Sequence, residues 1–389
     1  MKVYYVANFY VPFEKAYGIQ LAKMCEALIE AGADVVVVAP RRHGGAPLQT
    51  PREFYNLRVP LPVRYLPTLP LFNFGRIGFV IASAFFMIVY LKYLWWKRLM
   101  GEKFVIHAID MDQFSFALVP LVGVAFIAEL HDAKPRSLSF AFLLSRARHI
   151  LVVNRLIKEA LMKNFSLPSE KITVAPNGID ERMYEELPTK EAARDALGIP
   201  RGSKLALYVG RLYDWKGTEI LAEAARLTPD VTIGFLGATE EEYEKVTGEH
   251  APRNLRFFGS VSHGEVPKWL AAADLLLVLG TKQNEYSYRY TSPMKLFEYL
   301  PLGRPIVAAR TPAIESVVSE KEVFFYEPDN VTDLSHVITK ALEPHLGVGL
   351  PSGKIAEFSW KRRALLLLTS SLNSATIKNR YPTLSKGNL

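Results

Sequence analysis

The hydrophobic residues of the first half of the chain form short runs separated by amphipathic stretches. Strand-like runs are predicted at residues 2–9 and 34–40, and the segment between them, from about Gly18 to Gly32, has the apolar spacing of a helix. The run DVVVVAP at 34–40 is apolar at nearly every position, which is typical of a parallel strand buried on both faces. Strands alternating with helices predict a doubly wound α/β domain. Further strands are predicted at 103–110, 124–130 and 149–154.

The same alternation restarts after about residue 185. A polar, turn-rich segment at 177–189 predicts a linker, so we expect one Rossmann-like domain at 1–182 and a second at 183–357. In open parallel sheets ligands bind beyond the carboxyl ends of the strands, and two such domains facing each other would enclose a cleft. Strand-like runs of the second half are predicted at 205–212, 231–237, 255–261, 274–280, 305–310 and 323–328.

Composition and charge limit the classes of function. The 389 residues carry a formal net charge of +8, yet they show no zinc-finger spacing and no basic tail, so phosphate or membrane is a better partner than nucleic acid. Cys25 is the only cysteine, which excludes internal disulfides and indicates a reducing compartment. The first residues do not resemble a signal peptide, and we expect a cytoplasmic protein.

Two segments of the second half carry candidate phosphate-binding chemistry. Arg211 and Lys216 follow the strand LALYVG, where two cations could clamp a diphosphate, although ordinary surface residues would have the same pattern. Ser292 is a good helix N-cap and Pro293 suits the first helical position, so an anion-binding helix start is predicted here. Glu298 lies roughly 7 Å further along that helix, where it could accept ribose hydroxyls. The alternative is a solvated i,i+3 pair of Glu298 with Lys295.

The motifs VAPNGID (174–180), YVGRLYDWKG (208–217), VSHGEVPKWLAAADLLLV (261–278) and YTSPMKLFEYLPLGRPIVA (290–308) resemble those of retaining nucleotide-sugar glycosyltransferases of the GT-B fold, the group 1 or family 4 type. The likeness extends from residue 17 to residue 368. It implies two Rossmann-like domains facing across a cleft, with a C-terminal helix at about 358–376 returning to the first domain. It also implies transfer of a sugar from a nucleotide-diphosphate-sugar to a lipid-linked or saccharide acceptor, without a metal or other cofactor.

The resemblance also implies roles for individual residues. Arg211 and Lys216 would hold the diphosphate, Glu298 the ribose, and His131, in the sequence HD after a predicted strand, the transferred sugar. Many relatives have a second Glu eight positions before the ribose Glu, where this chain has Tyr290. Relatives with a Ser-Pro-x-Lys motif often share this absence, so the role of Glu298 stands, and the resemblance does not extend to the usual Glu contact with the donor sugar. The other donor-binding residues implied are Gly18, Gly210, Ser292, Pro293, Met294 and Lys295.

Other functions compete with glycosyl transfer. A nucleotide-sugar epimerase shares the fold and the nucleotide site, and the absence of the second Glu keeps a noncatalytic, membrane-associated partner of a transferase open. A dehydrogenase is disfavoured because no Gly-x-Gly-x-x-Gly turn follows the first strand. Asp110 and Asp112 have the spacing of a divalent-metal site, but Asp112 could equally cap the next helix.

The apolar run at 77–91 has 15 residues before the first charge, which is short for a membrane span. Spanning would also separate the first strands from the rest of their sheet. A buried core helix and a helix lying on a membrane both remain, and the flanking Trp95, Trp96, Lys97 and Arg98 favour the second. An anionic membrane surface, at the inner face of the membrane, is therefore a further candidate partner.

Overall fold

The computed structural model describes residues 1–43, 49–72, 74–343 and 358–371. These residues form two compact units: unit 1 contains residues 1–176 and the segment that starts at Trp360, and unit 2 contains Asn177–Ser359. The chain therefore changes unit once after Pro176 and again after Ser359. These two points are neighbours in space, because Ile179 N donates to Phe358 O at 2.6 Å and Ile179 forms a β-bridge with Ser359.

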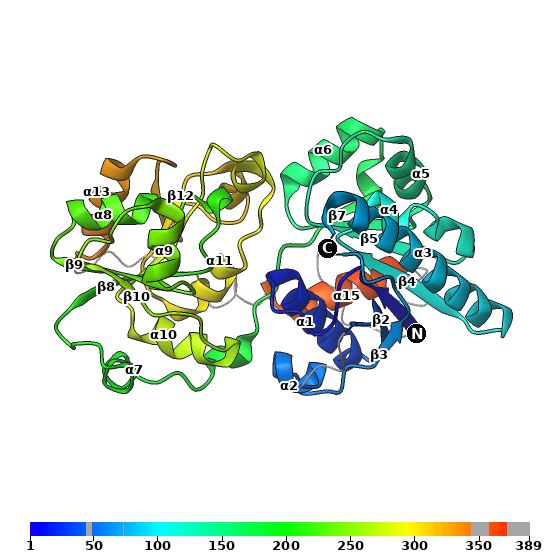
Figure 1. Ribbon diagram of the computed structural model, residues 1–389, viewed down its shortest axis with the longest axis horizontal. Helices are drawn as coiled ribbons and strands as arrows, with labels where there is room; N and C mark the ends of the chain where they lie inside the picture. Colours follow the sequence, from blue (N-terminus) through cyan, green and yellow to red (C-terminus); the bar gives the residue numbers. More distant parts are fainter. Residues whose placement is uncertain (44–48, 73, 344–357, 372–389) are drawn as a thin grey trace. The chain divides into compact units, whose positions relative to one another are not determined.

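Unit 1 is built on a seven-stranded parallel sheet with the strand order β3-β2-β1-β4-β5-β6-β7 (Figure 1). Its strands are β1 Lys2–Val6, β2 Asp34–Pro40, β3 Val63–Leu66, β4 Phe104–Ile109, β5 Phe126–Leu130, β6 His149–Val152 and β7 Ile172–Val174. Its helices are α1 Ala16–Glu30, α2 Pro51–Tyr55, α3 Gly75–Leu99, α4 Gln113–Phe116, α5 Leu138–Arg146, α6 Arg155–Phe165 and α15 Trp360–Ser371, with short 3₁₀ turns η1 Val119–Val122 and η2 Ser169–Lys171.

Unit 2 is built on a six-stranded parallel sheet with the order β10-β9-β8-β11-β12-β13. Its strands are β8 Lys204–Val209, β9 Val231–Leu236, β10 Leu255–Phe257, β11 Leu275–Val278, β12 Ile306–Ala309 and β13 Phe324–Tyr326. Its helices are α7 Lys190–Leu197, α8 Ile220–Leu227, α9 Glu240–Thr247, α10 Val266–Ala272, α11 Met294–Tyr299, α12 Pro312–Glu315 and α13 Val331–Ala341. Its short helical turns are η3 Glu181–Tyr184, η4 Asp214–Lys216, η5 His263–Glu265, η6 Tyr286–Tyr290 and η7 Leu300–Leu302.

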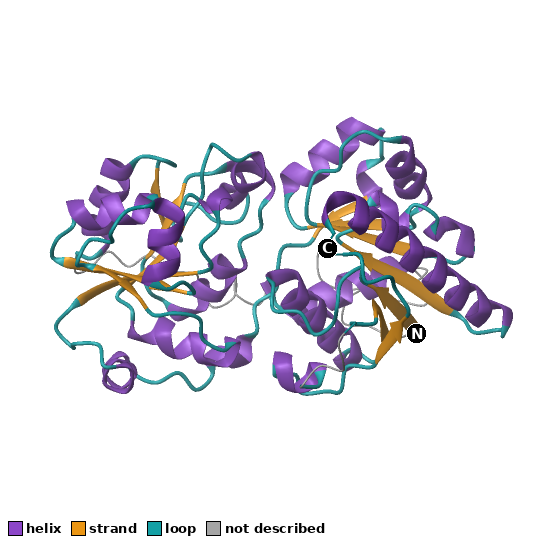
Figure 2. Ribbon diagram, in the orientation of Figure 1, coloured by secondary structure: helices purple, strands orange, loops and turns teal. Residues whose placement is uncertain are grey.

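Helices cover both faces of each sheet, as Figure 2 shows. In unit 1, α1, α2 and α15 lie on one face, and α3, α4, α5 and α6 lie on the other. This two-sided cover explains the apolar strand sequences, because side chains on both faces of a central strand are removed from water. The central strand β1 pairs with β2 on one side and with β4 on the other, and Val3, Tyr4 and Tyr5 on it are buried. The predicted doubly wound α/β architecture is confirmed in both units.

The C-terminal helix α15 packs against α1 of unit 1, as the prediction of a returning helix requires. Ala364, Leu367 and Leu368 on α15 are buried. The predicted helix continues to residue 376, and residues 372–376 lie outside the described part of the chain.

Candidate active site

The strand β8 ends at the point where the strand order of unit 2 reverses. It pairs with β9 on one side and with β11 on the other, so the helices that follow these strands diverge to opposite faces and leave room beyond the strand end. Gly210 and Arg211 follow β8 directly, and the turn η4 then leads to Lys216. A Cβ on Gly210 would lie 2.7 Å from the hydroxyl of Tyr208, so a larger residue would not fit without a shift.

Lys216 is largely buried among aromatic rings and lies near a second cation. Its Nζ is 5.3 Å from the ring centres of both Tyr213 and Trp215. Burial, and then the charge of Lys295, lower the pKa of Lys216 to about 8. Among the described residues no carboxylate forms an ion pair with Lys216. Lys216 and Lys295 are two cations, and the one carboxylate paired with them, Glu298, contacts Lys295, so positive charge remains at this end of the sheet and suits an anionic ligand.

The helix α11 differs in two respects from its sequence prediction. It begins at Met294, its N-cap is Pro293, and no side chain caps it. Ser292 is therefore not the N-cap, and Pro293 is not the first helical residue. The hydroxyl of Ser292 is instead buried without a hydrogen-bond partner in the described structure, while the carbonyl of Ser292 accepts from Asn177 Nδ2 at 2.8 Å.

Glu298 is buried, which corrects the interpretation of an exposed, solvated pair with Lys295. The pair exists, with Lys295 Nζ 2.8 Å from Glu298 Oε2, but Glu298 is only 8% exposed. Burial alone would raise the pKa of Glu298, but the charge of Lys295 and the contact with His263 outweigh it and lower the pKa to about 2. Glu298 is thus ionised at neutral pH and can accept hydrogen bonds only.

Sequence reasoning missed two residues that lie beside α11. His263 Nε2 is 3.7 Å from Glu298 Oε1, too long for a hydrogen bond, and Asn177 holds the backbone of Ser292. Within the described chain, His263 Nε2, Asn177 Oδ1 and Ser292 Oγ are buried polar atoms without hydrogen-bond partners. Buried groups of this kind are rare in proteins, and a bound water or ion and a catalytic role are among the explanations for them. Asn177 and His263 lie in two of the motifs that carried the resemblance, but their contact with α11 is visible only in three dimensions.

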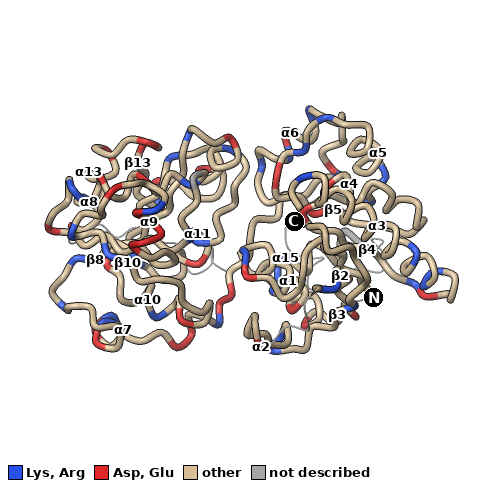
Figure 3. Tube along the Cα trace, in the orientation of Figure 1, with Lys and Arg blue, Asp and Glu red and all other residues tan. Residues whose placement is uncertain are grey.

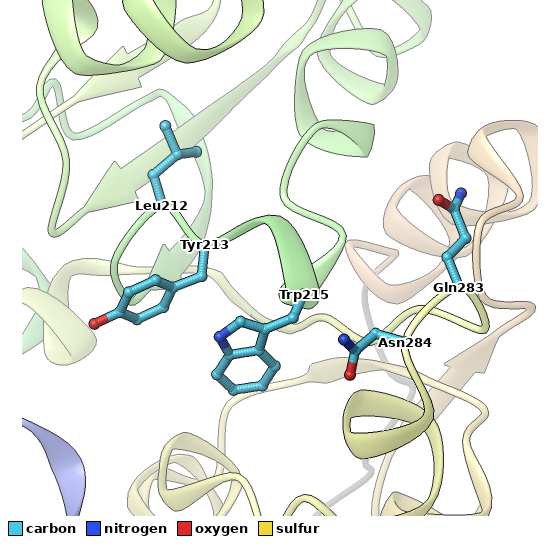
Figure 4. A pocket seen from close by; sticks show the side chains of 5 residues that line it. All are labelled: Leu212, Tyr213, Trp215, Gln283 and Asn284. Carbon is cyan, nitrogen blue, oxygen red and sulfur yellow. The ribbon is translucent and has the colours of Figure 1, made fainter. Parts of the chain in front are cut away.

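An open aromatic hollow lies next to Lys216. It is lined by Tyr213 and Trp215 from one loop and by Gln283 and Asn284 from another, with Leu212 at its side (Figure 4). The rings of Tyr213 and Trp215 are nearly parallel, 18° apart, with their centres at 5.9 Å, and Tyr286 meets Trp215 edge-on at 5.3 Å. Flat aromatic surfaces of this kind can stack against the faces of ligand rings.

In unit 1, His131 lies just beyond the carboxyl end of β5, as predicted. Its Nε2 is 3.0 Å from Glu129 Oε1, and its side chain is 12% exposed. Gly18 lies inside α1, where an added Cβ would be 2.3 Å from the carbonyl oxygen of Phe13. Packing therefore accounts for the glycine, and its predicted contact with the sugar donor stays a prediction.

Asp112 has the structural role that its position suggested. Its Oδ1 accepts from the backbone N–H groups of Phe114 and Ser115 at 2.7 and 2.8 Å, so it is the N-cap of α4. Asp110 has a left-handed backbone, with φ of 48°, and its Oδ1 lies 3.7 Å from Lys134 Nζ. In the described ranges no group of three or more His, Cys, Asp or Glu side chains is close enough to hold a metal ion.

The helix α3 carries an exposed apolar face. Its buried side, with Phe86, Tyr90 and Leu94, packs on unit 1, and Asn8 Nδ2 donates to Ser83 at 2.9 Å. Between Arg76 and Lys92 the helix has no charged residue, and its trace carries neither charge colour there in Figure 3. The members of this apolar face are 37–76% exposed and follow each other at helical spacing: Ile77, Ile81, Phe85, Ile88, Trp95 and Leu99.

By length and composition, α3 alone among the described helices could cross a membrane, with a mean hydropathy of 2.0 over a window that is 39% buried. A core helix is mostly buried, so α3 does not fit that alternative completely. The cations at the C-terminal end of α3 also differ from the expectation that they face a membrane. Lys97 Nζ is 3.2 Å from Glu102, and Arg98 donates to the carbonyl of Val122, so both cations are engaged within unit 1.

Comparison with known proteins finds a family model that is similar to each unit. Residues 18–182 match the family described as Glycosyltransferase Family 4, and residues 189–345 match the family described as Glycosyl transferases group 1. Each half of the chain is thus similar to a glycosyltransferase domain, the first to the family 4 model and the second to the group 1 model.

Individual relatives agree with this assignment. The chain is 30% identical to alpha-galactosylglucosyldiacylglycerol synthase of Streptococcus pneumoniae over 172 residues, 42% of this chain and 44% of that protein. It spans about half the length of the curated relatives it matches. Two solved structures share the fold across the chain. Sucrose-phosphate synthase of Thermosynechococcus elongatus has a TM-score of 0.73 at 17% identity, covering 95% of this chain and 97% of that one. Alr3699/HepE of Anabaena, in complex with UDP-glucose, has a TM-score of 0.65 at 19% identity, with full coverage of both chains. The predicted GT-B fold is confirmed.

Proposed function

We propose that this protein is a retaining glycosyltransferase that moves a sugar from a nucleotide-diphosphate-sugar to a hydroxyl group of a lipid-linked or saccharide acceptor. The observation that carries the proposal is the cluster at the end of β8. There Lys216 lies near Lys295, and Lys295 holds the buried carboxylate of Glu298. Cations suit a diphosphate, and an ionised, acceptor-only carboxylate suits the hydroxyls of a ribose. A relative that synthesises a glycolipid and a structural neighbour that binds UDP-glucose support the choice of substrates.

The chemistry assigned to the site is mainly electrostatic. The acceptor hydroxyl oxygen forms a bond to the anomeric carbon while the bond from that carbon to the diphosphate breaks, and the hydroxyl proton passes to a phosphate oxygen. Arg211 and Lys216 stabilise the negative charge that develops on the leaving diphosphate. Ser292 Oγ and the backbone that follows it bind the distal phosphate, and Glu298 binds the ribose. His131 is assigned to the transferred sugar by resemblance.

The experiment starts with the donor. Thermal-shift screening against UDP-, GDP-, ADP- and TDP-sugars identifies the nucleotide, and incorporation of labelled sugar into a membrane lipid extract measures transfer. The anomeric configuration of the product, read by NMR, tests retention. An epimerase would instead release an altered sugar without any acceptor, and a noncatalytic partner would bind without turnover.

Two variants test the cation cluster. Arg211→Ala and Lys216→Ala should each lower kcat/KM for the donor, with a loss of roughly 2 to 4 kcal/mol of transition-state stabilisation. Each variant removes a positive charge that would contact the leaving diphosphate. Arg256→Ala is the matched control, since Arg256 is an exposed cation on the edge strand β10. Wild-type turnover in both site variants would refute the assignment.

We further propose that unit 1 binds the inner face of an anionic membrane through the exposed apolar face of α3, as a peripheral cytoplasmic protein whose acceptor is lipid-linked. Three observations support this. The face is apolar where an ordinary surface helix would be polar, Trp95 and Trp96 suit the membrane interface, and Arg76 and Lys92 are exposed cations on the same helix. Because the other side of α3 packs on unit 1, the helix would lie in the interface and not cross it.

A further inference from the structure

Glu129 of β5 is a fully buried carboxylate contacted by polar side chains from five other segments of unit 1. Tyr5 Oη donates to Oε2 at 3.0 Å, and His107 Nε2 lies 2.9 Å from the same oxygen. Oε1 accepts from Gln20 Nε2 at 2.9 Å and from Arg363 of α15, and His131 Nε2 lies 3.0 Å from it. Strands β1, β4 and β5, helices α1 and α15 and the loop after β5 thus meet at one side chain.

Glu129 stays ionised in this setting. Burial alone would raise its pKa, but the charge of Arg363 and then the contacts with His107 and His131 hold the pKa well below its usual range. Burial lowers the pKa of His107, so that ring is neutral at physiological pH. Removing a carboxylate from water costs several kcal/mol, and Arg363 alone would neutralise it. Charge balance therefore does not explain why His131, the partly exposed member of the cluster, is also bound.

The carboxylate favours one tautomer of the His131 ring. An ionised carboxylate only accepts, so the tautomer of a neutral His131 ring that satisfies this contact is the one with the proton on Nε2, the nitrogen 3.0 Å from Glu129. Gln20 Nε2 also lies 2.9 Å from His131 Nε2, so the two tautomers compete: the Nε2–H form donates to Glu129, and the Nδ1–H form accepts from Gln20. Turning the Gln20 amide would place its oxygen against the carboxylate, so the observed orientation is the favourable one. No described residue hydrogen-bonds to His131 Nδ1.

We propose that Glu129 is a positioning residue that holds His131 as the Nε2–H tautomer and leaves Nδ1 as an acceptor for a substrate hydroxyl. The proposal rests on the proposed function for its substrate. A lone pair on Nδ1 attracts an O–H group and repels a phosphate oxygen, so the tautomer selects a sugar hydroxyl over the diphosphate. Arg363 supports the same arrangement, because it binds Glu129 and also donates to Pro176 O at 2.7 Å, where the chain leaves unit 1.

The tautomer can be measured without any activity. Long-range ¹H–¹⁵N NMR spectra of the full chain with labelled histidine distinguish the two tautomers, and the His131→Gln variant assigns the signal. We expect the Nε2–H tautomer in the wild-type chain and a mixture or the Nδ1–H form in Glu129→Gln. Glu102→Gln is the matched control, because Glu102 is a hydrogen-bonded carboxylate of unit 1 that contacts Tyr4 and Lys2. The proposal is overturned if the wild-type chain shows the Nδ1–H form, a result that does not depend on any variant. It is also overturned if the folded Glu129→Gln variant keeps the wild-type tautomer.

Kinetics test whether the tautomer matters for transfer. Glu129→Gln should lower kcat about tenfold to a hundredfold, with nucleoside diphosphate affinity unchanged, and the double variant with His131→Gln should lose no more than the worse single variant. Full activity with an altered tautomer, or additive losses, contradicts a positioning role. If the wild-type chain turns over no nucleotide-sugar, the proposed function fails, and the NMR result still decides the tautomer.

Discussion

Lys216 is a cation whose charge depends on pH within an accessible range. Because burial and then Lys295 lower its pKa to about 8, it is charged at neutral pH and loses its proton as the pH rises through 8. Affinity for a nucleoside diphosphate should therefore fall above pH 8, by up to about tenfold per pH unit. Lys216→Arg should remove this fall, because Arg stays charged throughout. Calorimetric titrations between pH 6.5 and 9.5 measure both.

The control for this pH profile is Lys282→Arg. Lys282 is an exposed lysine of unit 2 that pairs with Glu327, and its contact with Glu327 raises its pKa, so its replacement should leave the wild-type profile unchanged. An affinity that stays constant to pH 9.5 in the wild-type chain would show that Lys216 does not contact the diphosphate.

At the residue scale, the sequence predicted which side chains belong to the candidate site better than it predicted their burial and their contacts. Lys216 and Glu298 were predicted from their positions after a strand and along a helix, and both lie where such patterns place them. The burial of Glu298 could not be predicted, because it depends on segments distant in the sequence that cover α11. His263 and Asn177 were missed for the same reason. His263 contacts Glu298, 35 positions further along the chain (298 − 263), and Asn177 contacts Ser292, 115 positions further along (292 − 177).

At the scale of elements, α3 provides the prediction with the clearest control. Its apolar face from Ile77 to Leu99 is roughly 33 Å long at 1.5 Å per residue, and insertion of such a face into an interface is favourable. The wild-type chain should sediment with anionic vesicles, and added salt should weaken binding. Ile77→Glu combined with Ile81→Glu should abolish sedimentation. Leu227→Glu is the control, because Leu227 is an exposed leucine of α8 in unit 2, 55% exposed.

The structure also changes the choice of charge variants for that experiment. Lys97 and Arg98 are bound to Glu102 and to the Val122 carbonyl, so reversing their charge would disturb the fold. Arg76→Glu and Lys92→Glu test the electrostatic part instead, at about 1 kcal/mol for each cation near the surface. A wild-type chain that stays in the supernatant with excess anionic vesicles at low salt, or one that self-associates through α3 without lipid, contradicts the membrane proposal.

Among the elements, strand prediction succeeded where both faces of a strand are buried. The run DVVVVAP became β2 with the predicted limits, Asp34–Pro40, because no amphipathic alternative fits a continuous apolar run. The strands β3 and β7 were missed, since they are short, lie at the two edges of the sheet and are only partly apolar. The predicted start of α11 was wrong. Ser292 is a residue type that often caps helices, but here its carbonyl accepts a hydrogen bond from Asn177 and the helix begins two residues later, at Met294.

At the scale of the whole molecule, two parallel-sheet units of the same type place candidate ligand-binding loops at the ends of two sheets. This arrangement was predictable from the restart of the strand and helix alternation near residue 185 and from motifs spread over nearly the whole chain. The identity of the acceptor was not predictable, because the first unit carries few motif residues. The buried cluster of Gln20, Glu129 and Arg363 was not predictable either, because its members come together from both ends of the chain.

The last prediction is that donor turnover persists in excess chelator. Glycosyltransferases need positive charge to neutralise a leaving diphosphate, and a divalent metal or protein cations can supply it. In unit 2 that charge is available from Arg211, Lys216 and Lys295, so turnover with EDTA should equal turnover without it. A loss that Mn²⁺ or Mg²⁺ restores would contradict this and would make Asp110 and Asp112 the residues to replace by Asn.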